Sequence, residues 1–112
     1  KVTEVSYAGL QSSKYNKLAN KYLPKGAGSI FTIKLKGGYD ACVSMVERVK
    51  LISHVANVGD TRSLIIHPAS TTHSQLTEKQ KIQSGSSSNT IRLSIGLETC
   101  SDIIRDLNQA LN

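Results

Sequence analysis

Arg92 is the residue whose type and position point most directly to chemistry. It lies within residues 90–95, where apolar and polar side chains alternate as in a strand with one buried face. A guanidinium can hold a carboxylate through two parallel hydrogen bonds, and an arginine in the middle of a strand is costly unless it meets an anion. Spacing alone leaves two interpretations equally open: Arg92 binds a carboxylate ligand, or it forms an internal salt bridge with an acidic residue such as Glu98.

The remaining polar residues do not form a self-sufficient catalytic or metal site. His67 and His73 lie six positions apart across a proline, which is no standard zinc-ligand spacing. We therefore expect the histidines to have hydrogen-bonded structural roles and the chain to hold no metal. The serines near them in the sequence lack the strand–nucleophile–helix elbow of the hydrolases. The glycine-rich stretches fit neither a phosphate-binding loop nor a dinucleotide fingerprint, and we interpret them as turns.

The two cysteines are too few for a disulfide scaffold. Cys42 and Cys100 each fall on the apolar stripe of an expected helix, so we expect two buried free thiols in a reducing compartment, with a catalytic cysteine as the minor alternative. No apolar run approaches the length that spans a bilayer, and residues 1–8 lack the apolar stretch and cleavage site of a signal peptide. These features predict a cytoplasmic protein with no membrane partner.

Length and charge limit the class of protein further. The chain has 112 residues, of which 38% are hydrophobic, and this suits one domain with a modest core. It begins with Lys1 and its only methionine is Met45, so we expect a piece of a longer protein. The formal net charge is +6, but the lysines are spaced along one expected helix and one expected strand. We expect a solvated basic face and no nucleic-acid partner, and a stand-alone basic binding module remains a remote alternative.

Hydrophobic periodicity and turn residues divide the chain into short strands and amphipathic helices. In chain order we expect an extended segment at 1–11, a helix between Ser13 and Pro24, a strand at 29–36, a helix at 39–49, strands at 51–57 and 63–67, a helix at 77–83, a strand at 90–95 and a helix at 99–111. This order predicts an α+β fold in which helices cover one face of a small, mostly antiparallel sheet. Arg92 and Ser94 project toward the free face, which we expect to meet a ligand or another domain.

Three of the expected helices should contribute an apolar stripe to the core. The stripes comprise Tyr15, Leu18, Ala19 and Tyr22, then Cys42, Met45, Val46 and Val49, and finally Cys100, Ile103, Ile104, Leu107, Ala110 and Leu111. Thr99 should cap the last helix, with Asp102 three residues further on in a box-like arrangement.

Two motifs resemble the C-terminal signature of the Cys/Met-metabolism enzymes that depend on pyridoxal phosphate (PLP). These enzymes include the cystathionine synthases and lyases, methionine γ-lyase and O-acetylhomoserine sulfhydrylase. The motifs are residues 63–73 (SLIIHPASTTH) and residues 91–98 (IRLSIGLE). Residues 102–111 are similar to the family's last helix, and residues 21–28 (KYLPKGAG) and 56–60 (ANVGD) resemble the sulfhydrylase branch in particular. The resemblance covers essentially the whole chain, and the paired motifs are specific.

The resemblance implies a fold-type I PLP enzyme in which residues 1–112 are a single C-terminal domain that closes over a cofactor held by a separate large domain. Arg92 matches the family's arginine for the substrate α-carboxylate, and Asn57 matches a position that contacts the same carboxylate. Ser63 matches a serine near the Schiff-base lysine of the cystathionine enzymes. Arg62 stands where cystathionine lyases tend to carry glutamate, which favours a sulfhydrylase over a lyase for a substrate with a distal amino group.

The activity implied is the conversion of O-acetylhomoserine and sulfide to homocysteine and acetate, in methionine biosynthesis, by a homo-oligomer that the family resemblance makes a tetramer. A cystathionine γ-synthase, a cystathionine γ-lyase or a methionine γ-lyase is the alternative. No lysine here lies in the family's Ser-x-x-Lys context, so we expect the large domain to bind most of the PLP and this chain alone to catalyse nothing. The chain departs from the family at Ala8, usually proline, and at Ser86 and Thr90, commonly apolar.

Overall fold

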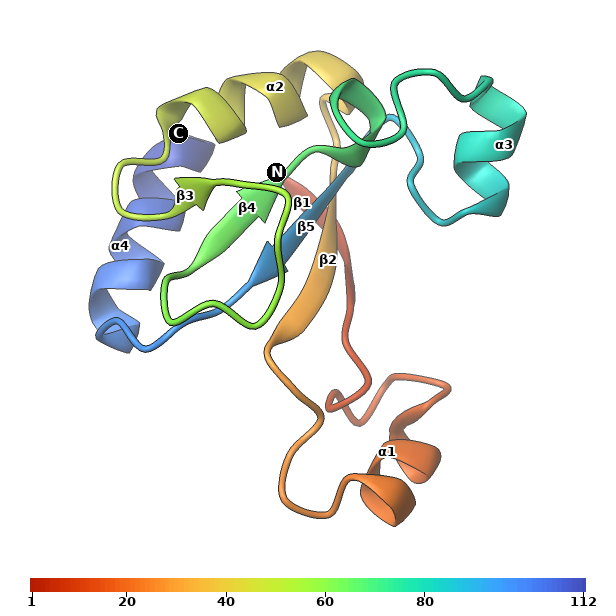
Figure 1. Ribbon diagram of the computed structural model, residues 1–112, viewed down its shortest axis with the longest axis vertical. Helices are drawn as coiled ribbons and strands as arrows, with labels where there is room; N and C mark the ends of the chain where they lie inside the picture. Colours follow the sequence, from red (N-terminus) through yellow and green to blue (C-terminus); the bar gives the residue numbers. More distant parts are fainter.

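One five-stranded sheet organises the molecule, and the computed structural model describes all of residues 1–112. In chain order the elements are β1 (Val2–Ser6), α1 (Asn16–Tyr22), β2 (Ile30–Leu35), α2 (Gly38–Arg48), β3 (Ser53–His54), β4 (Leu64–Ile66), the 3₁₀ turn η1 (Pro68–Ser70), α3 (Glu78–Gln83), β5 (Thr90–Ser94) and α4 (Cys100–Leu111) (Figure 1). The strands lie in the order β1-β2-β5-β4-β3, and every pairing is antiparallel except that of β3 with β4. The α+β fold and the mostly antiparallel sheet are confirmed.

The core lies on the sheet face that α2 and α4 cover (Figure 1). Ile91 and Leu93 of the central strand β5 are fully buried there, between Ile33 and Phe31 of β2 on one side and Ile65 of β4 on the other. Cys42, Met45 and Val46 on α2, and Ile103 and Ala110 on α4, pack onto them. Burying each large aliphatic side chain stabilises the fold by about 1.5–3 kcal/mol, so this face holds the sheet and the two helices together.

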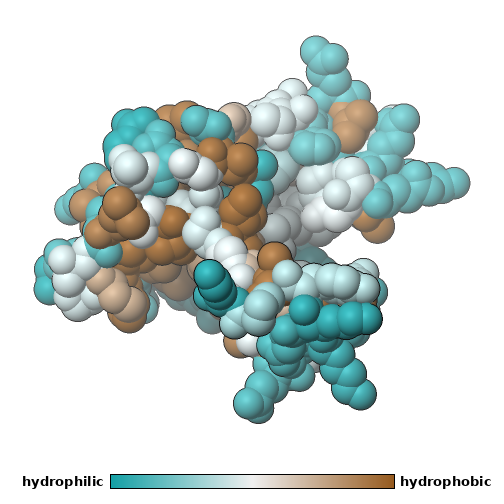
Figure 2. Space-filling view, turned by 60° about the horizontal axis from the view of Figure 1, so that its bottom comes forward, coloured by the Kyte–Doolittle hydropathy of each residue, from teal (hydrophilic) through white to brown (hydrophobic).

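The apolar face of α1 does not join this core, and that expectation was wrong. Tyr15, Leu18 and Tyr22 are 55%, 54% and 67% exposed, and only Ala19 is buried. The reason is visible in Figure 1, where α1 lies beyond the far ends of β1 and β2, away from α2 and α4. Periodicity identifies an amphipathic helix but does not say whether a second layer of the same chain lies beneath it. Hydrophilic side chains gather on the parts that project from the sheet (Figure 2).

Helix α4 differs from expectation at its start. Cys100 and Ile104 are exposed, so only Cys42 is a buried thiol, and burial raises its pKa to about 11. Thr99 makes no side-chain capping bond, and Asp102 instead pairs with Arg105 at 2.9 Å. A capping box that was not predicted is found on α3 instead, where the Thr77 and Gln80 side chains each accept from the other's backbone N–H. None of the helices is long and apolar enough to cross a bilayer.

The expected strand at 51–57 shrinks to the two residues of β3, because the chain around it is held by a side chain rather than by a sheet ladder. Asp106 of α4 accepts hydrogen bonds from the backbone N–H groups of Lys50, Leu51 and Ile52 at 2.8, 2.9 and 3.0 Å. Beyond β3, residues 55–62 form a loop that crosses in front of β4 and β5 (Figure 1). This loop brings the sequence-predicted site residues near one another.

Candidate carboxylate-binding site on the open sheet face

Arg92 lies on the face of β5 opposite the core. Its register partners are Thr32 of β2 and Ile66 of β4, and its side chain is half-buried. Its guanidinium Nη2 donates to the backbone oxygen of Asn57 at 3.2 Å. No ion pair involves Arg92, so the internal salt bridge with Glu98 is not the arrangement found. A guanidinium has five N–H donors, and those not used on Asn57 are available to an anion.

Asn57 approaches Arg92 through its main chain, not through its side chain. Its Oδ1 accepts from the backbone N–H of Val58 at 2.9 Å, which stabilises the turn in which the loop changes direction. The structure therefore brings two of the predicted site residues, Arg92 and Asn57, into direct contact. The open position of Asn57 on the surface leaves its amide N–H₂ free of any intramolecular bond.

The side chain of Arg62 is 60% exposed and points toward Asp60, two residues earlier in the sequence. Its Nη2 lies 3.2 Å from Asp60 Oδ2, while Asp60 Oδ1 accepts from the Arg62 backbone N–H at 3.0 Å. These backbone and side-chain hydrogen bonds from Arg62 lower the pKa of Asp60, and the pairing raises that of Arg62. Asp60 was not singled out in the sequence, although an acid two residues before an arginine is a pattern of local pairing in turns.

Ser63 is fully buried, and its hydroxyl is committed to protein partners. The hydroxyl donates to Glu98 Oε2 at 2.7 Å and accepts from the Gly96 N–H at 2.9 Å, while the Ser63 N–H donates to Glu98 Oε1 at 2.6 Å. The backbone bond from Ser63 and then its hydroxyl lower the pKa of Glu98. Glu98 is thus bound to the loop end, not to Arg92, and sequence reasoning missed this role.

The face around Arg92 is less open than the strand pattern indicated. Ser94 points away from the core as expected, but it is only 2% exposed, and its Oγ has no hydrogen-bond partner. The loop of residues 55–62 closes over this end of the face, with the Leu97 N–H donating to Thr61 O at 2.8 Å. Arg92 forms no wall of the four cavities of the chain, so the free face has no pocket at this residue within these 112 residues.

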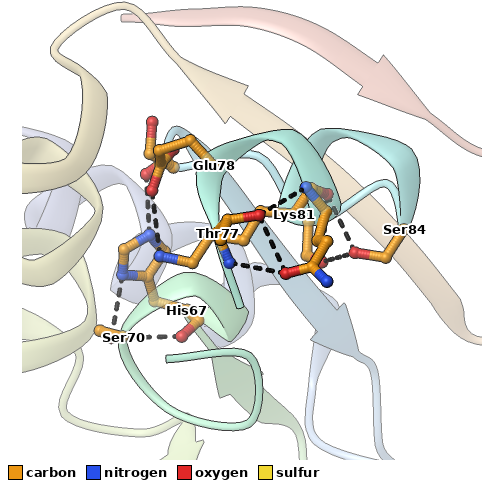
Figure 3. Close-up of polar contacts among 9 residues, drawn as sticks. His67, Ser70, Thr77, Glu78, Lys81 and Ser84 are labelled. Atoms are coloured by element: carbon orange, nitrogen blue, oxygen red, sulfur yellow. Dashed lines mark hydrogen bonds and ion pairs between the residues drawn. The ribbon is translucent and has the colours of Figure 1, made fainter. Parts of the chain in front are cut away.

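A second polar cluster lies at the opposite end of β4 and serves the structure of η1 and α3 (Figure 3). Buried His67 bonds through Nε2 to Ser88 O at 2.8 Å and through Nδ1 to Ser70 Oγ at 3.0 Å. Because a carbonyl can only accept, Nε2 carries the proton. Burial lowers the pKa of His67 despite the bond to Ser88, and the charge of Lys81 adds to the lowering. The expected structural role of this histidine is confirmed.

No group of three or more His, Cys, Asp or Glu side chains is arranged to hold a metal ion. Lys81 is the only buried lysine, and its ammonium lies 3.0 Å from Glu78 in the cluster of Figure 3. The free guanidinium donors of Arg92 suit an organic carboxylate.

Over residues 1–112 the chain matches the model of a family described as Cys/Met metabolism PLP-dependent enzyme. The chain therefore belongs to the Cys/Met-metabolism family of PLP-dependent enzymes, as its motifs indicated.

Individual members of this family show which enzymes the chain is similar to. The chain is similar to O-acetyl-L-homoserine sulfhydrylase 1 of Thermus thermophilus, with 49% identity over 98% of this chain and 26% of that protein. It is 40% identical to an L-methionine gamma-lyase of Fusobacterium nucleatum, over 99% of this chain and 28% of the relative. A crystal structure described as an O-acetylhomoserine (thiol)-lyase from Campylobacter jejuni, containing a pyridoxyl-lysine phosphate, superposes with a TM-score of 0.91 at 43% identity, over 98% of this chain and 26% of that one. The chain spans about a quarter of the length of these relatives.

Proposed function

We propose that this chain is the substrate-carboxylate-binding, C-terminal domain of a PLP-dependent O-acetylhomoserine sulfhydrylase. The observation that carries the proposal is the unpaired guanidinium of Arg92 on the open sheet face, beside Asn57. The identity with sulfhydrylases of up to 49% supports the choice of reaction. The partners proposed are a large PLP-binding domain of the same polypeptide, further copies of the enzyme, an amino-acid substrate and sulfide.

In this proposal Arg92 binds the α-carboxylate of O-acetylhomoserine with two charge-assisted hydrogen bonds. Asn57 contributes polar contacts from the loop, and its carbonyl fixes one edge of the guanidinium so that the other donors face the substrate. Holding the carboxylate fixes the orientation of the bonds at Cα, and positioning of this kind can contribute several kcal/mol to the lowering of a barrier. PLP, when bound, supplies an electron sink for the charge that develops at Cα.

The first test uses the full-length enzyme and replaces Arg92 with alanine. Losing a bidentate pair should weaken substrate binding by roughly 2–4 kcal/mol, measured as the increase in KM for O-acetylhomoserine. Arg92→Lys should recover part of the loss, since a point charge remains without the planar fork. Arg105→Ala, which removes an exposed arginine from α4, is the matched control and should leave KM unchanged. Unchanged kinetics in Arg92→Ala would make Arg92 a structural residue.

The second test concerns the choice of reaction, for which Arg62 is the proposed discriminator. A cation at this position should repel the distal amino group of cystathionine but not the neutral ester of O-acetylhomoserine. The ion pair with Asp60 reduces this repulsion, so the effect depends on whether Arg62 leaves Asp60 in the assembled enzyme. We expect sulfhydrylation to exceed both cystathionine cleavage and methionine γ-elimination in the wild type, and Arg62→Glu to shift the ratio toward cystathionine. Efficient cystathionine or methionine cleavage by the wild type would reject the assignment.

A further inference from the structure

The carboxylate of Glu98, together with backbone hydrogen bonds, fixes the C-terminal end of the loop that contacts Arg92. Glu98 accepts from both the N–H and the hydroxyl of Ser63, at 2.6 and 2.7 Å, and the same hydroxyl accepts from the Gly96 N–H at 2.9 Å. These bonds join the chain leaving β5 to the chain entering β4. Ser63 itself is fully buried, whereas the carboxylate of Glu98 is half-buried.

The close approach at Gly96 shows how tightly the two segments meet. A Cβ atom at Gly96 would lie 2.3 Å from Thr61 O, 2.4 Å from the carbonyl carbon of Arg62 and 2.6 Å from Ser63 N. The Leu97 N–H donates to the same Thr61 O at 2.8 Å. Glycine at position 96 is therefore required for the backbones of residues 61–63 and 96–98 to come into contact. The carboxylate of Glu98 then holds these two segments together through its bonds to Ser63.

The other end of the loop rests on Arg92 alone. Between β3 and Thr61, the Arg92–Asn57 hydrogen bond is the only bond from this loop to the sheet. Asn57, Val58 and Gly59 are exposed, so the loop has little packing of its own to define its position. Its position over the guanidinium thus depends on the fixed end at Ser63.

We propose that Glu98, acting through Ser63 and Gly96, is a positioning residue for the substrate-carboxylate site: it sets the distance of the Asn57 loop from Arg92 and so aims the guanidinium donors. This inference rests on the proposed role of Arg92 but assigns a function to Glu98, which makes no hydrogen bond or ion pair with Arg92. Glu98 acts on the affinity for a carboxylate and leaves the rest of the substrate site unaffected.

The experiment compares two ligands that differ only in the carboxylate. L-Methionine and 3-(methylthio)propylamine are titrated into the full-length enzyme with its PLP, and the dissociation constants are read from the absorption change of the cofactor. The quantity of interest is the preference for the acid over the amine. Glu98→Gln is nearly isosteric and retains the acceptor for the Ser63 N–H, but it no longer accepts from the Ser63 hydroxyl as an anion. Ser63→Ala removes the hydroxyl from the other side.

Glu98→Gln should reduce the preference for the acid by roughly 3- to 10-fold, the equivalent of one weakened charge-assisted bond, with amine binding unchanged. Ser63→Ala should reduce the preference for the acid by a similar factor, and the double variant should lose no more of that preference than either single variant. Glu4→Gln, which removes a carboxylate paired with Lys34 on the edge strand, is the matched control and should keep the wild-type preference.

Two results in Glu98→Gln and Ser63→Ala would overturn the positioning role. Loss of acid and amine binding by equal factors in Glu98→Gln and Ser63→Ala would overturn the proposal, because that result describes a general structural defect. A preference equal to that of Glu4→Gln would also overturn it. Arg92→Ala, measured in parallel, separates the two levels: if it retains the full preference, the proposed function of Arg92 fails, whereas a loss in Arg92→Ala without one in Glu98→Gln rejects only the positioning role.

Discussion

Asp106 and Glu98 hold the two ends of the same stretch of chain, and the difference between them separates stability from function. Asp106, on the core side, accepts from three consecutive backbone N–H groups just before β3. Glu98, on the open face, accepts from one N–H and one hydroxyl just before β4. Asp106 is a buried residue of α4, and its bonds attach this helix to the segment that leads from α2 into the sheet. Glu98 lies beside the loop that contacts Arg92 and defines the candidate site.

The pKa values of the two carboxyl groups show the same contrast. Burial opposes ionisation of Asp106, yet the N–H groups of Ile52, Lys50 and Leu51 outweigh it and hold the pKa below its ordinary value. In Glu98 the bonds from Ser63 lower the pKa, and burial opposes them less. Asp106 stays ionised despite its burial because the fold supplies its hydrogen bonds, so we expect its removal to destabilise the fold. Glu98 lies nearer the surface, so its replacement should damage the fold less.

The largest effect should follow from removing Asp106. Asp106→Ala leaves three backbone N–H groups without their acceptor, and we expect the free energy of unfolding to fall by about 4 kcal/mol, measured by urea denaturation. Asp106→Asn keeps one oxygen acceptor and should lose about half as much. Asp102→Asn, in an exposed ion pair on the same helix, should change stability by less than about 0.5 kcal/mol. Equal losses at positions 106 and 102 would contradict the comparison.

A Cβ atom at Gly96 should have the next largest effect, and it should change both the stability of the fold and the KM for substrate. Gly96→Ala forces the backbone at Thr61 and Arg62 to move, because the added atom would lie well inside contact distance. We expect a loss of about 2–3 kcal/mol in stability, together with a higher KM for the amino-acid substrate in the full-length enzyme. Loss of stability with an unchanged KM would show that the loop can shift without disturbing the site.

Acidic pH should lower the free energy of unfolding, because Asp106 and Glu98 become protonated there. Both carboxyl groups have folded-state pKa values below their ordinary 3.8 and 4.5, so they contribute stability that is fully present above those values and is lost as the pH falls through the lowered pKa values. Unfolding measured from pH 7 to pH 3 should show a decline below about pH 4.5. Asp106→Ala should flatten that decline more than Glu98→Gln does. An equally steep decline in Asp106→Ala would remove Asp106 from the acid response.

The smallest effect should be a gain. The Ser94 hydroxyl is buried on the open face without a hydrogen-bond partner, so Ser94→Ala should raise the stability of the 112-residue chain by about 1 kcal/mol. Thr90→Ala is the control from the same face, since its hydroxyl bonds to Ser87 Oγ at 2.8 Å, and it should lower stability. A loss of stability in Ser94→Ala would show that the hydroxyl has a partner in solution.

The amino-acid sequence by itself determined the elements and the family. Alternating apolar residues identified β2 and β5, helical periodicity identified α2 and α4, and the motif around Arg92 indicated the PLP family that the comparisons confirm. These features are local or depend on short motifs, and a short window of sequence contains them. The position of Arg92 opposite Ile91 and Leu93 also follows directly from strand alternation.

Only the tertiary structure decided which side chains meet. The contacts of Glu98 with Ser63 and of Asp106 with residues 50–52 join positions 35 and more than 50 residues apart, and no local pattern predicts them. The strand pattern did not show that Ser94 would be buried, and the periodicity of α1 did not show that its apolar face would lack a layer to cover it. The amphipathicity and charge of a segment indicate what kind of surface it can contact. Which residue it contacts depends on the tertiary structure, because buried groups and hydrogen bonds must find partners across the whole fold.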